Sequence, residues 1–563
     1  MNHLPMTATP PMLLLGRPEF EDSAIAQIQR SQGDLAAWHA LLATGPAAQA
    51  LCRVGGSFAL ALTLADGRQV LAVDRFAIQT LCYSVVDGQL RCAERADALA
   101  DAGSAIDPQA IFDYLYFHAI PSPRTIFKGV LRLPAGHLAT VAGGEVTVLP
   151  YWTPRFEPEA SPSFPALRDQ FMGLARQAVK RELDGSRPAC FLSGGTDSST
   201  VAGLIGDVTG QPAATFSIGF EAEGYDEMAF ARIAAKRFNT EHHEYYVTPD
   251  DLVRHIPGLA AHHDQPFGNS SALPAYCCAI KARDAGVSRL LAGDGGDELF
   301  GGNSRYAKQR IFGWYGLMPA ALRKGLMEPF FGLAPVARTP LLKKGSSYIE
   351  QARVPMPDRL QMYNLLLHLG LPDVLCPGFL AQVDVQDPAR QQRQVYATAT
   401  ATNEIDRMLA FDWRYTLAES DLPKVRSSIA LAGISVGFPL LDKDLLALSM
   451  RLPPDYKLRG LKLRWFFKEA LRGYLPDEIL SKKKQGFGLP FGVWAMRHAG
   501  LHQLAADSLR SLATRDIVRP AFIEALLNTH LPAHPGYFGE MVWILMMLEQ
   551  WLGSHAADFK LSA

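Results

Sequence analysis

The sequence has few of the features that mark membrane, secreted or nucleic-acid-binding proteins. No stretch reaches the roughly 18 consecutive apolar residues that a membrane-spanning helix needs. The first twenty residues, MNHLPMTATPPMLLLGRPEF, have no basic start, and prolines interrupt their apolar run, so no signal peptide is predicted. The formal net charge is only -1, which gives no electrostatic reason to expect nucleic acid or a membrane as a partner. We therefore expect a soluble, cytoplasmic protein.

Cysteine is scarce and scattered. The chain has seven cysteines, none of them in a CxxC pair, so neither a disulfide framework nor a zinc site is predicted. Cys277 and Cys278 lie in an apolar helical stretch and are predicted to be part of the core. The stretch EHHE at 241–244 also favours a structural role, because neighbours in a strand point to opposite faces and no HExxH pattern follows.

A Walker A loop is absent as well, but another phosphate-binding pattern is present. The stretch FLSGGTDSST at 191–200 follows an apolar segment and is not continued by Gly-Lys-Ser/Thr. Its glycines allow backbone N–H groups to approach an anion, its serines add hydroxyl donors, and the following helix adds its positive end. Asp197 would repel phosphate unless a cation stood between them, so we interpret it as a Mg²⁺ ligand. An ordinary glycine-rich turn with a helix cap is the alternative.

The order of strand and helix patterns predicts two successive parts of the chain with different folds. Residues 54–92 and 136–152 read as short antiparallel strands with turns at Asp87-Gly88 and Gly143-Gly144. A Pro/Ser-rich stretch at 157–165 marks the boundary. Beyond it, strand and helix patterns alternate up to about residue 293, which predicts a doubly wound parallel sheet. Residues 303–480 are predicted to be mostly helical, and no internal repeat is visible. The fold class is α/β.

A second loop favours the phosphate interpretation over an ordinary turn. The stretch AGDGGDELFGG at 292–302 also follows an apolar strand and again combines glycine with acidic residues. In parallel sheets, ligands bind outside the carboxyl ends of the strands. Asp294, Asp297 and Glu298 could therefore complete a metal site facing Asp197. We predict that the two loops meet at one ligand.

At this point the sequence resembles the ATP-pyrophosphatase family, whose members split ATP into AMP and pyrophosphate. The SGGTDSS loop carries this likeness. The stretches DQPFGNSSALPAY, GDGGDELFGG, ISVGFPLLDKDLLALSM and LPDEILSKKKQGFGLPFGVW resemble the glutamine-dependent asparagine synthetases. Relatives of that group include β-lactam synthetases and lasso-peptide macrolactam synthetases. The resemblance implies a degenerate Ntn-hydrolase-like glutaminase domain over 1–156, and an asparagine-synthetase-like ATP-binding domain over 157–563 with a largely helical second half.

The resemblance also implies a set of site residues and two cofactors, ATP and Mg²⁺. The metal ligands would be Asp197 and Asp297, and the catalytic residues would be Lys483 and Asp294. Lys484 is adjacent to Lys483 in the KKK run, so a register shifted by one residue stays open. Adenosine would contact Leu192, Ile218, Ala292 and Gly293, and the pyrophosphate would contact Ser193, Gly194, Gly195 and Ser198.

The sequence departs from the family where glutamine would be hydrolysed. The family nucleophile is an N-terminal cysteine that uses its own α-amine as base, whereas position 2 is Asn and the nearest cysteine is Cys52. The Arg-Gly-Pro and Asn-Gly-Glu elements that bind glutamine are absent too. Gln265 and Asn269 stand where asparagine synthetases carry acids. We therefore expect no glutamine hydrolysis, and a changed substrate pocket.

Together these observations predict an AMP-forming amide synthetase that adenylates a carboxylate and joins it to an amine. Lasso-peptide macrolactam formation is our first choice, with a peptide substrate and a leader peptidase or peptide-recognition protein as a partner. Asparagine synthesis from free ammonia and β-lactam-type cyclisation of a small molecule are the alternatives. A non-catalytic nucleotide-binding scaffold and a tRNA-modifying enzyme fit less well. Asp197, Asp297 and Lys483 are all present, and no basic, aromatic-rich segment suggests RNA binding.

Overall fold

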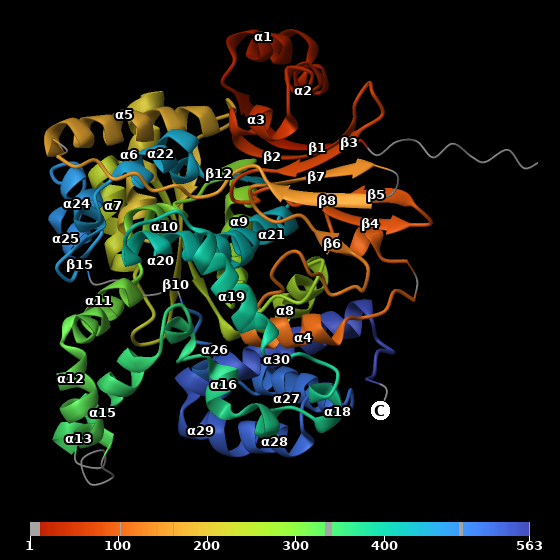
Figure 1. The fold of residues 1–563 in the computed structure, drawn as a ribbon, viewed down its shortest axis with the longest axis vertical. Helices are drawn as coiled ribbons and strands as arrows, with labels where there is room; N and C mark the ends of the chain where they lie inside the picture. Colours follow the sequence, from red (N-terminus) through yellow and green to blue (C-terminus); the bar gives the residue numbers. More distant parts are fainter. Residues whose placement is uncertain are drawn as a thin grey trace, which may run out of the picture.

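The computed structural model describes residues 12–101, 103–142, 145–161, 163–332, 340–482 and 488–561. It confirms the α/β class, with an antiparallel N-terminal part followed by a parallel sheet and many helices (Figure 1). In the described part of the chain, no helix is both long enough and apolar enough to cross a bilayer.

The N-terminal part consists of two antiparallel sheets; its first three helices cover the outer side of the larger sheet, and its fourth packs on the second part of the chain. The larger sheet has the order β1-β2-β3-β7-β8 and the smaller one the order β5-β4-β6. The strands are β1 (Leu13–Phe20), β2 (Val54–Thr63), β3 (Gln69–Val73), β4 (Cys82–Val86), β5 (Gln89–Ala93), β6 (Leu131–Arg132), β7 (His137–Ala142) and β8 (Glu145–Pro150). The helices are α1 (Ser23–Gln32), α2 (Asp34–Leu42), α3 (Ala47–Cys52) and α4 (Pro108–Phe117).

Alternation along the strands explains this layering. In β2, Phe58, Leu60 and Leu62 face α1 to α3, whereas Ala59 and Ala61 face the smaller sheet. Side chains of one strand point alternately to its two sides, so the uninterrupted apolar run at positions 58–62 of β2 buries both faces of the sheet. The predicted turn at Asp87-Gly88 is confirmed, with both residues at positive φ (50° and 74°).

The second part is built on a five-stranded parallel sheet with the order β11-β10-β9-β12-β13. Its strands are β9 (Ala189–Phe191), β10 (Ala214–Phe220), β11 (Glu241–Val247), β12 (Arg289–Leu291) and β13 (Ser435–Gly437). The helices that belong to the alternating region are α5 (Phe164–Glu182), α6 (Thr196–Thr209), α7 (Met228–Phe238), α8 (Pro249–His262), α9 (Ala272–Asp284) and α10 (Gly296–Phe300). Helices α5, α6 and α7 pack on one face, and α9 on the other. The predicted doubly wound sheet is confirmed.

The remainder is helical, as predicted for 303–480, and continues so to the C-terminal region. The longer helices are α11 (Ser304–Leu317), α15 (Pro340–Arg353), α19 (Asp387–Thr398), α20 (Glu404–Asp412), α21 (Leu422–Leu431), α22 (Lys443–Arg451), α27 (Ala499–Ala513) and α30 (Pro535–His555). Shorter ones include α12 (Ala320–Leu322), α13 (Glu328–Gly332), α24 (Trp465–Ala470) and the π-helix η4 (Trp413–Asp421). A short hairpin, β14 (Leu458–Arg459) with β15 (Lys462–Leu463), precedes α24.

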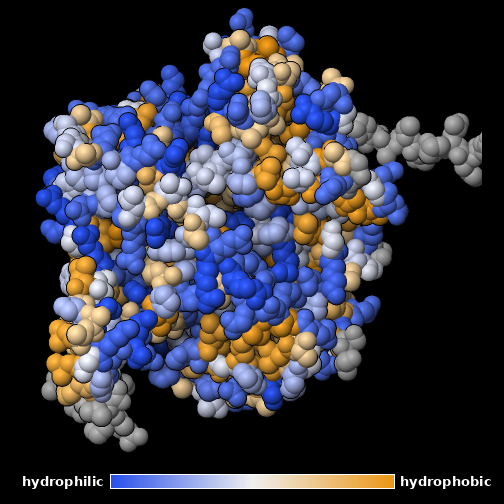
Figure 2. Space-filling model, viewed as in Figure 1, coloured by the Kyte–Doolittle hydropathy of each residue, from blue (hydrophilic) through white to orange (hydrophobic). Residues whose placement is uncertain are grey.

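Two features of the helical half affect the surface and the joint between the parts. Helices α11 to α13 project from the body and expose apolar side chains, among them Leu317 (83% exposed) (Figures 1 and 2). Helix α4 of the N-terminal part packs against the buried helix α30, where the Tyr114 hydroxyl donates to Ile544 O (2.8 Å). The two parts are therefore joined by a common hydrophobic core and not only by the chain segment that links them.

Candidate active site

The first predicted loop lies where expected, between β9 and α6. Ser193 and Ser198 brace it: Ser193 N donates to Ser198 Oγ (3.1 Å), and the two hydroxyls are 3.1 Å apart. Gly194 has φ +69°, and a Cβ there would overlap the backbone at the start of α7. Gly195 has no side chain to cap the 14-residue helix α6, so the first N–H groups of that helix face the loop. This is an anion-binding arrangement.

The second predicted loop, between β12 and α10, contacts the first. A Cβ on Gly293 would lie 2.8 Å from Ser198 N, so this contact requires glycine. Gly295 has φ +102°, which glycine adopts without strain. The two loops follow adjacent strands, since Leu291 of β12 pairs with Cys190 of β9. The predicted meeting of the loops at one edge of the sheet is therefore what the structure shows.

The two predicted metal ligands converge on an arginine that the sequence did not reveal. Arg464 Nη1 donates to Asp197 Oδ2 (2.8 Å) and to Asp297 Oδ1 (2.6 Å), and its Nη2 donates to Asp197 Oδ1. The Arg464 side chain is only 7% exposed, and its guanidinium lies over the Phe467 ring at 4.3 Å. Both carboxylates therefore point at the same guanidinium. Nothing in the surrounding RGLKLRW sequence predicts this proximity, because β14 and β15 form a separate hairpin.

The donors present fit a metal that is bound together with phosphate. Within the described residues, no group of three or more His, Cys, Asp or Glu side chains is arranged to hold a metal ion. Mg²⁺ commonly takes only one or two carboxylates and completes its shell with phosphate oxygens and water. Asp197 and Asp297 supply two carboxylates beside an anion-binding loop. The larger acidic cluster that we expected, with Asp294 and Glu298 as further ligands, is not formed among those residues.

Asp294 instead faces a largely buried lysine. Lys424 Nζ lies 3.7 Å from Asp294 Oδ1 and 3.0 Å from Asp421 Oδ1. Burial raises the pKa of Asp294 to about 6; Lys424 opposes this rise, and the charges of Asp421 and Asp197 add to it. The neighbouring carboxylates raise the pKa of Lys424 despite its burial, so it stays charged. A carboxyl group with a pKa near neutrality can exchange protons at physiological pH.

The remaining predicted site residues divide into three groups. Leu192 and Ala292 are buried at the ends of β9 and β12. Ile218 of β10 lines a groove of about 330 Å³ on the α9 side of the sheet, together with Tyr245 and Lys281. Lys483 lies outside the described residues, as do Lys484 and Gln485. The adenosine contacts and the lysine role therefore stay predictions.

The two positions that depart from the family pattern lie where the N-terminal part meets the π-helix η4. The Gln265 side chain is buried and its Nε2 donates to Ile120 O (3.3 Å). Asn269 Nδ2 donates to Ser420 Oγ (3.1 Å). Beside them Arg414 pairs with Glu419, which accepts from the Ser122 hydroxyl at 2.7 Å. Polar side chains from both parts of the chain thus enclose this region.

All seven cysteines have the pKa of their thiol raised by burial. Cys52 is the most exposed of them, and its Sγ donates to Tyr151 O (3.0 Å). A nucleophilic cysteine needs a lowered pKa, so these thiols have the opposite character. Cys277 and Cys278 are buried in α9, as predicted. EHHE forms part of the edge strand β11, also as predicted.

Sequence comparison shows which known proteins this chain is similar to. The asparagine synthase family model matches residues 170–553, and the glutamine amidotransferase domain model matches residues 26–152. Asparagine synthetase [glutamine-hydrolyzing] 1 of Bacillus subtilis is 23% identical over 488 residues, which cover 85% of this chain and 74% of that protein. Amidase chyE of Penicillium rubens is 25% identical over 524 residues, which cover 83% of this chain and 76% of that protein.

Proposed function

The chain belongs to the asparagine synthase family, and on that premise we propose that it is an ATP-dependent carbon–nitrogen ligase that forms AMP and pyrophosphate. The observation that carries the proposal is the convergence of Asp197 and Asp297 on one point beside the anion-binding loop. These are the donors that a magnesium–triphosphate group requires. Mg²⁺, when bound, neutralises the charge on the leaving pyrophosphate.

The chemistry proceeds in two balanced steps. A carboxylate oxygen of the substrate attacks the α-phosphorus of ATP, and the bond to pyrophosphate breaks. An amine nitrogen then attacks the acyl carbon, the bond to AMP breaks with its electron pair, and the amine gives up a proton. The α6 N-terminus and the serine hydroxyls at 193 and 198 bind the phosphates. Asp294 accepts the proton, since burial holds its pKa at about 6.

The proposed source of the amine is the substrate itself rather than glutamine. The support is the raised pKa of every cysteine in the chain, because glutamine hydrolysis by this domain type needs a reactive thiolate. An amine on the same molecule as the acyl-adenylate closes a ring, and holding the two together gives a large rate advantage over water. We therefore propose macrolactam formation in a peptide, of the lasso type, with a leader-processing or peptide-recognition protein as its partner.

Asparagine synthesis from free ammonia is the second candidate, and the family assignment itself favours it. A β-lactam-type closure of a small molecule would use the same steps on a smaller substrate. The candidates differ in the acid and the amine, so they separate in one experiment. Pyrophosphate release is measured with aspartate plus ammonium, with small β-amino acids, and with peptides that carry an Asp or Glu side chain and a free α-amine.

The expected result is peptide-dependent release with loss of one water from the peptide mass. Asp197→Ala and Asp297→Ala are each expected to abolish release while the fold is retained. Release with aspartate and ammonium alone, giving asparagine, would replace the macrolactam proposal with the second candidate. Release that survives either substitution at the wild-type rate would contradict the metal assignment.

A further inference from the structure

The second loop of the active site is supported from behind by a segment that the N-terminal part holds. This segment, residues 438–442, connects β13 to α22. A Cβ on Gly295 would lie 2.8 Å from Leu441 Cγ, and a Cβ on Gly296 would lie 3.1 Å from Leu440 Cδ1. Leu440 and Leu441 therefore pack against the backbone of residues 295 and 296, directly before Asp297. These residues lie in segment 293–298, which consists of the loop after β12 and the first turn of α10.

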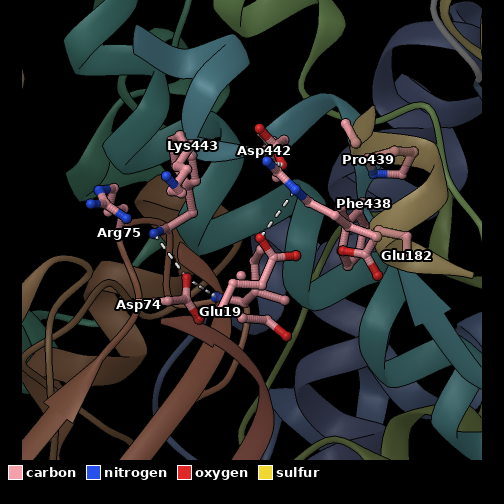
Figure 3. A pocket seen from close by; sticks show the side chains of 15 residues that line it. Glu19, Asp74, Arg75, Glu182, Phe438, Pro439, Asp442 and Lys443 are labelled. Carbon is pink, nitrogen blue, oxygen red and sulfur yellow. Dashed lines mark hydrogen bonds and ion pairs between the residues drawn. The ribbon is translucent and has the colours of Figure 1, made fainter. Parts of the chain in front are cut away.

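Lys443 joins this segment to the N-terminal part. Its Nζ lies 2.7 Å from Glu21 Oε1, and its stem is so close to Gly55 of β2 that a Cβ there would be 2.5 Å from Lys443 Cδ. Figure 3 shows Lys443, Asp442 and Glu19 among the side chains that line the contact between the two parts. Arg181 of α5 holds the other side of the segment, through Asp442 at 2.6 Å.

The joint is a packed contact rather than a binding pocket for a small molecule. The cavity between these residues measures about 20 Å³, which is room for about one water molecule. Its lining brings together charges of both signs, among them Glu19, Arg75, Arg181 and Lys443. A cavity this small, lined by charges of both signs, cannot hold a phosphate or a nucleotide. This contact can therefore fix the position of segment 438–442 relative to the N-terminal part.

A second contact reaches segment 293–298 through aromatic rings. Phe76 lies on the turn after β3, where Asp74 accepts hydrogen bonds from the backbone N–H groups of residues 58, 76, 78 and 79. Phe76 meets Trp413 edge to face at 6.1 Å, and Trp152 stacks on the same ring at 6.3 Å. Trp413 Nε1 donates to Glu298 O (3.0 Å), in the first turn of α10 next to Asp297.

We propose that the N-terminal domain, independently of any glutaminase activity, positions segment 293–298 and thereby Asp297, with Phe76 of this domain and Lys443 of α22, which contacts it, as the positioning residues. The proposal rests on the proposed function, because Asp297 matters only if Mg²⁺ and ATP bind there. Two unrelated contacts, one ionic and one aromatic, run from this domain to the same six residues. A metal ligand displaced by even a fraction of an ångström binds its ion less well.

The test compares Lys443→Met and Phe76→Leu with a matched control, Gln109→Ala. The methionine keeps the length of the Lys443 stem but removes its ammonium, and leucine keeps an apolar side chain at position 76. Gln109 also joins the two parts, through hydrogen bonds to Asp384 N (2.7 Å) and Asp384 O (3.3 Å), but the structure shows no contact from its side chain to segment 293–298 among the described residues. Each protein is tested at full length.

Binding of ATP is measured by calorimetry with and without Mg²⁺, and the melting temperature is recorded alongside. We expect Lys443→Met and Phe76→Leu to weaken magnesium-dependent ATP binding by about 2- to 30-fold, the range of coupling through packed networks. ATP binding without Mg²⁺ is expected to stay unchanged, because the first loop is untouched. Gln109→Ala is expected to change the melting temperature alone.

Unchanged magnesium-dependent binding in both variants, with only the melting temperature lowered, would overturn the positioning role and leave the proposed function standing. If wild-type protein itself binds no Mg²⁺–ATP, the proposed function fails first, and this inference fails with it. Should Phe76→Leu not fold, Trp413→Phe serves in its place. Phenylalanine keeps an aromatic ring at position 413 and removes the hydrogen bond from Trp413 Nε1 to Glu298 O.

Discussion

Replacing Arg464 with alanine is expected to turn the pair of carboxylates into a metal site that works without ATP. The guanidinium makes hydrogen bonds to both Asp197 and Asp297, and the three side chains are 7%, 20% and 21% exposed. Removing one partner of a buried charge network typically costs about 3–5 kcal/mol. Because the carboxylates keep some contact with solvent, we expect about 3 kcal/mol. The remaining negative charges then repel each other and attract a divalent cation.

The assay is the melting temperature of wild type, Arg464→Ala and Arg464→Lys at several Mg²⁺ or Mn²⁺ concentrations in the absence of nucleotide. Arg464→Ala is expected to melt lower than wild type and to be restabilised by the metal. At ten times its dissociation constant, a bound ion adds about 1.4 kcal/mol. Wild type and Arg464→Lys, which keep a cation in place, are expected to respond little. An Arg464→Ala protein with wild-type stability and no metal response would refute the reasoning.

Three further outcomes are expected. Lys483→Ala should lower kcat about 10²–10³-fold with a smaller change in the KM for ATP, because the charge that the lysine stabilises develops in the transition state. Lys484→Ala should leave both constants nearly unchanged. The reverse pattern in steady-state kinetics would move the assignment by one residue. Glutamine should yield no glutamate above background, and Cys52→Ala should leave pyrophosphate release unchanged; glutamate formation that Cys52→Ala removes would contradict this. Burial raises the pKa of Glu19 from 4.5 to about 7, so the folded protein binds this proton more tightly than the unfolded chain and loses stability as pH rises from about 4.5 to 7. Glu19→Gln should therefore match wild type near pH 4.5 and be more stable by roughly 1–2 kcal/mol above pH 7, a value reduced for the 33% exposure of the side chain; equal thermal melting of both proteins at pH 8 would show that Glu19 bears no such cost.

The two glycine-rich loops were predictable because their conformational signals are local. Gly194 and Gly195 precede a helix with the pattern of an anion site, and Gly295 stands in a turn that only glycine adopts easily. Each signal is confined to about ten residues. The rule that parallel strands present their carboxyl ends at one edge then brings the two loops together without further information.

The joint between the two parts was not predictable in the same way. Phe76 and Ile78 follow strand β3 and look like ordinary apolar turn residues, yet both belong to the core of the synthetase part. A Pro/Ser-rich stretch suggests a boundary along the chain, but it says nothing about which surfaces pack together afterwards. Packing of side chains from distant segments decided that, through contacts such as Phe76 with Trp413.

The sequence by itself determined the α/β class, the antiparallel-then-parallel order and the two glycine-rich loops, since hydrophobic periodicity and turn chemistry act over a few residues. Only the tertiary structure placed Arg464, 267 positions after Asp197, between the two carboxylates. It also placed Asp294 beside Lys424. An ion pair has no sequence period and no fixed spacing, so its partners are set by where folded segments meet.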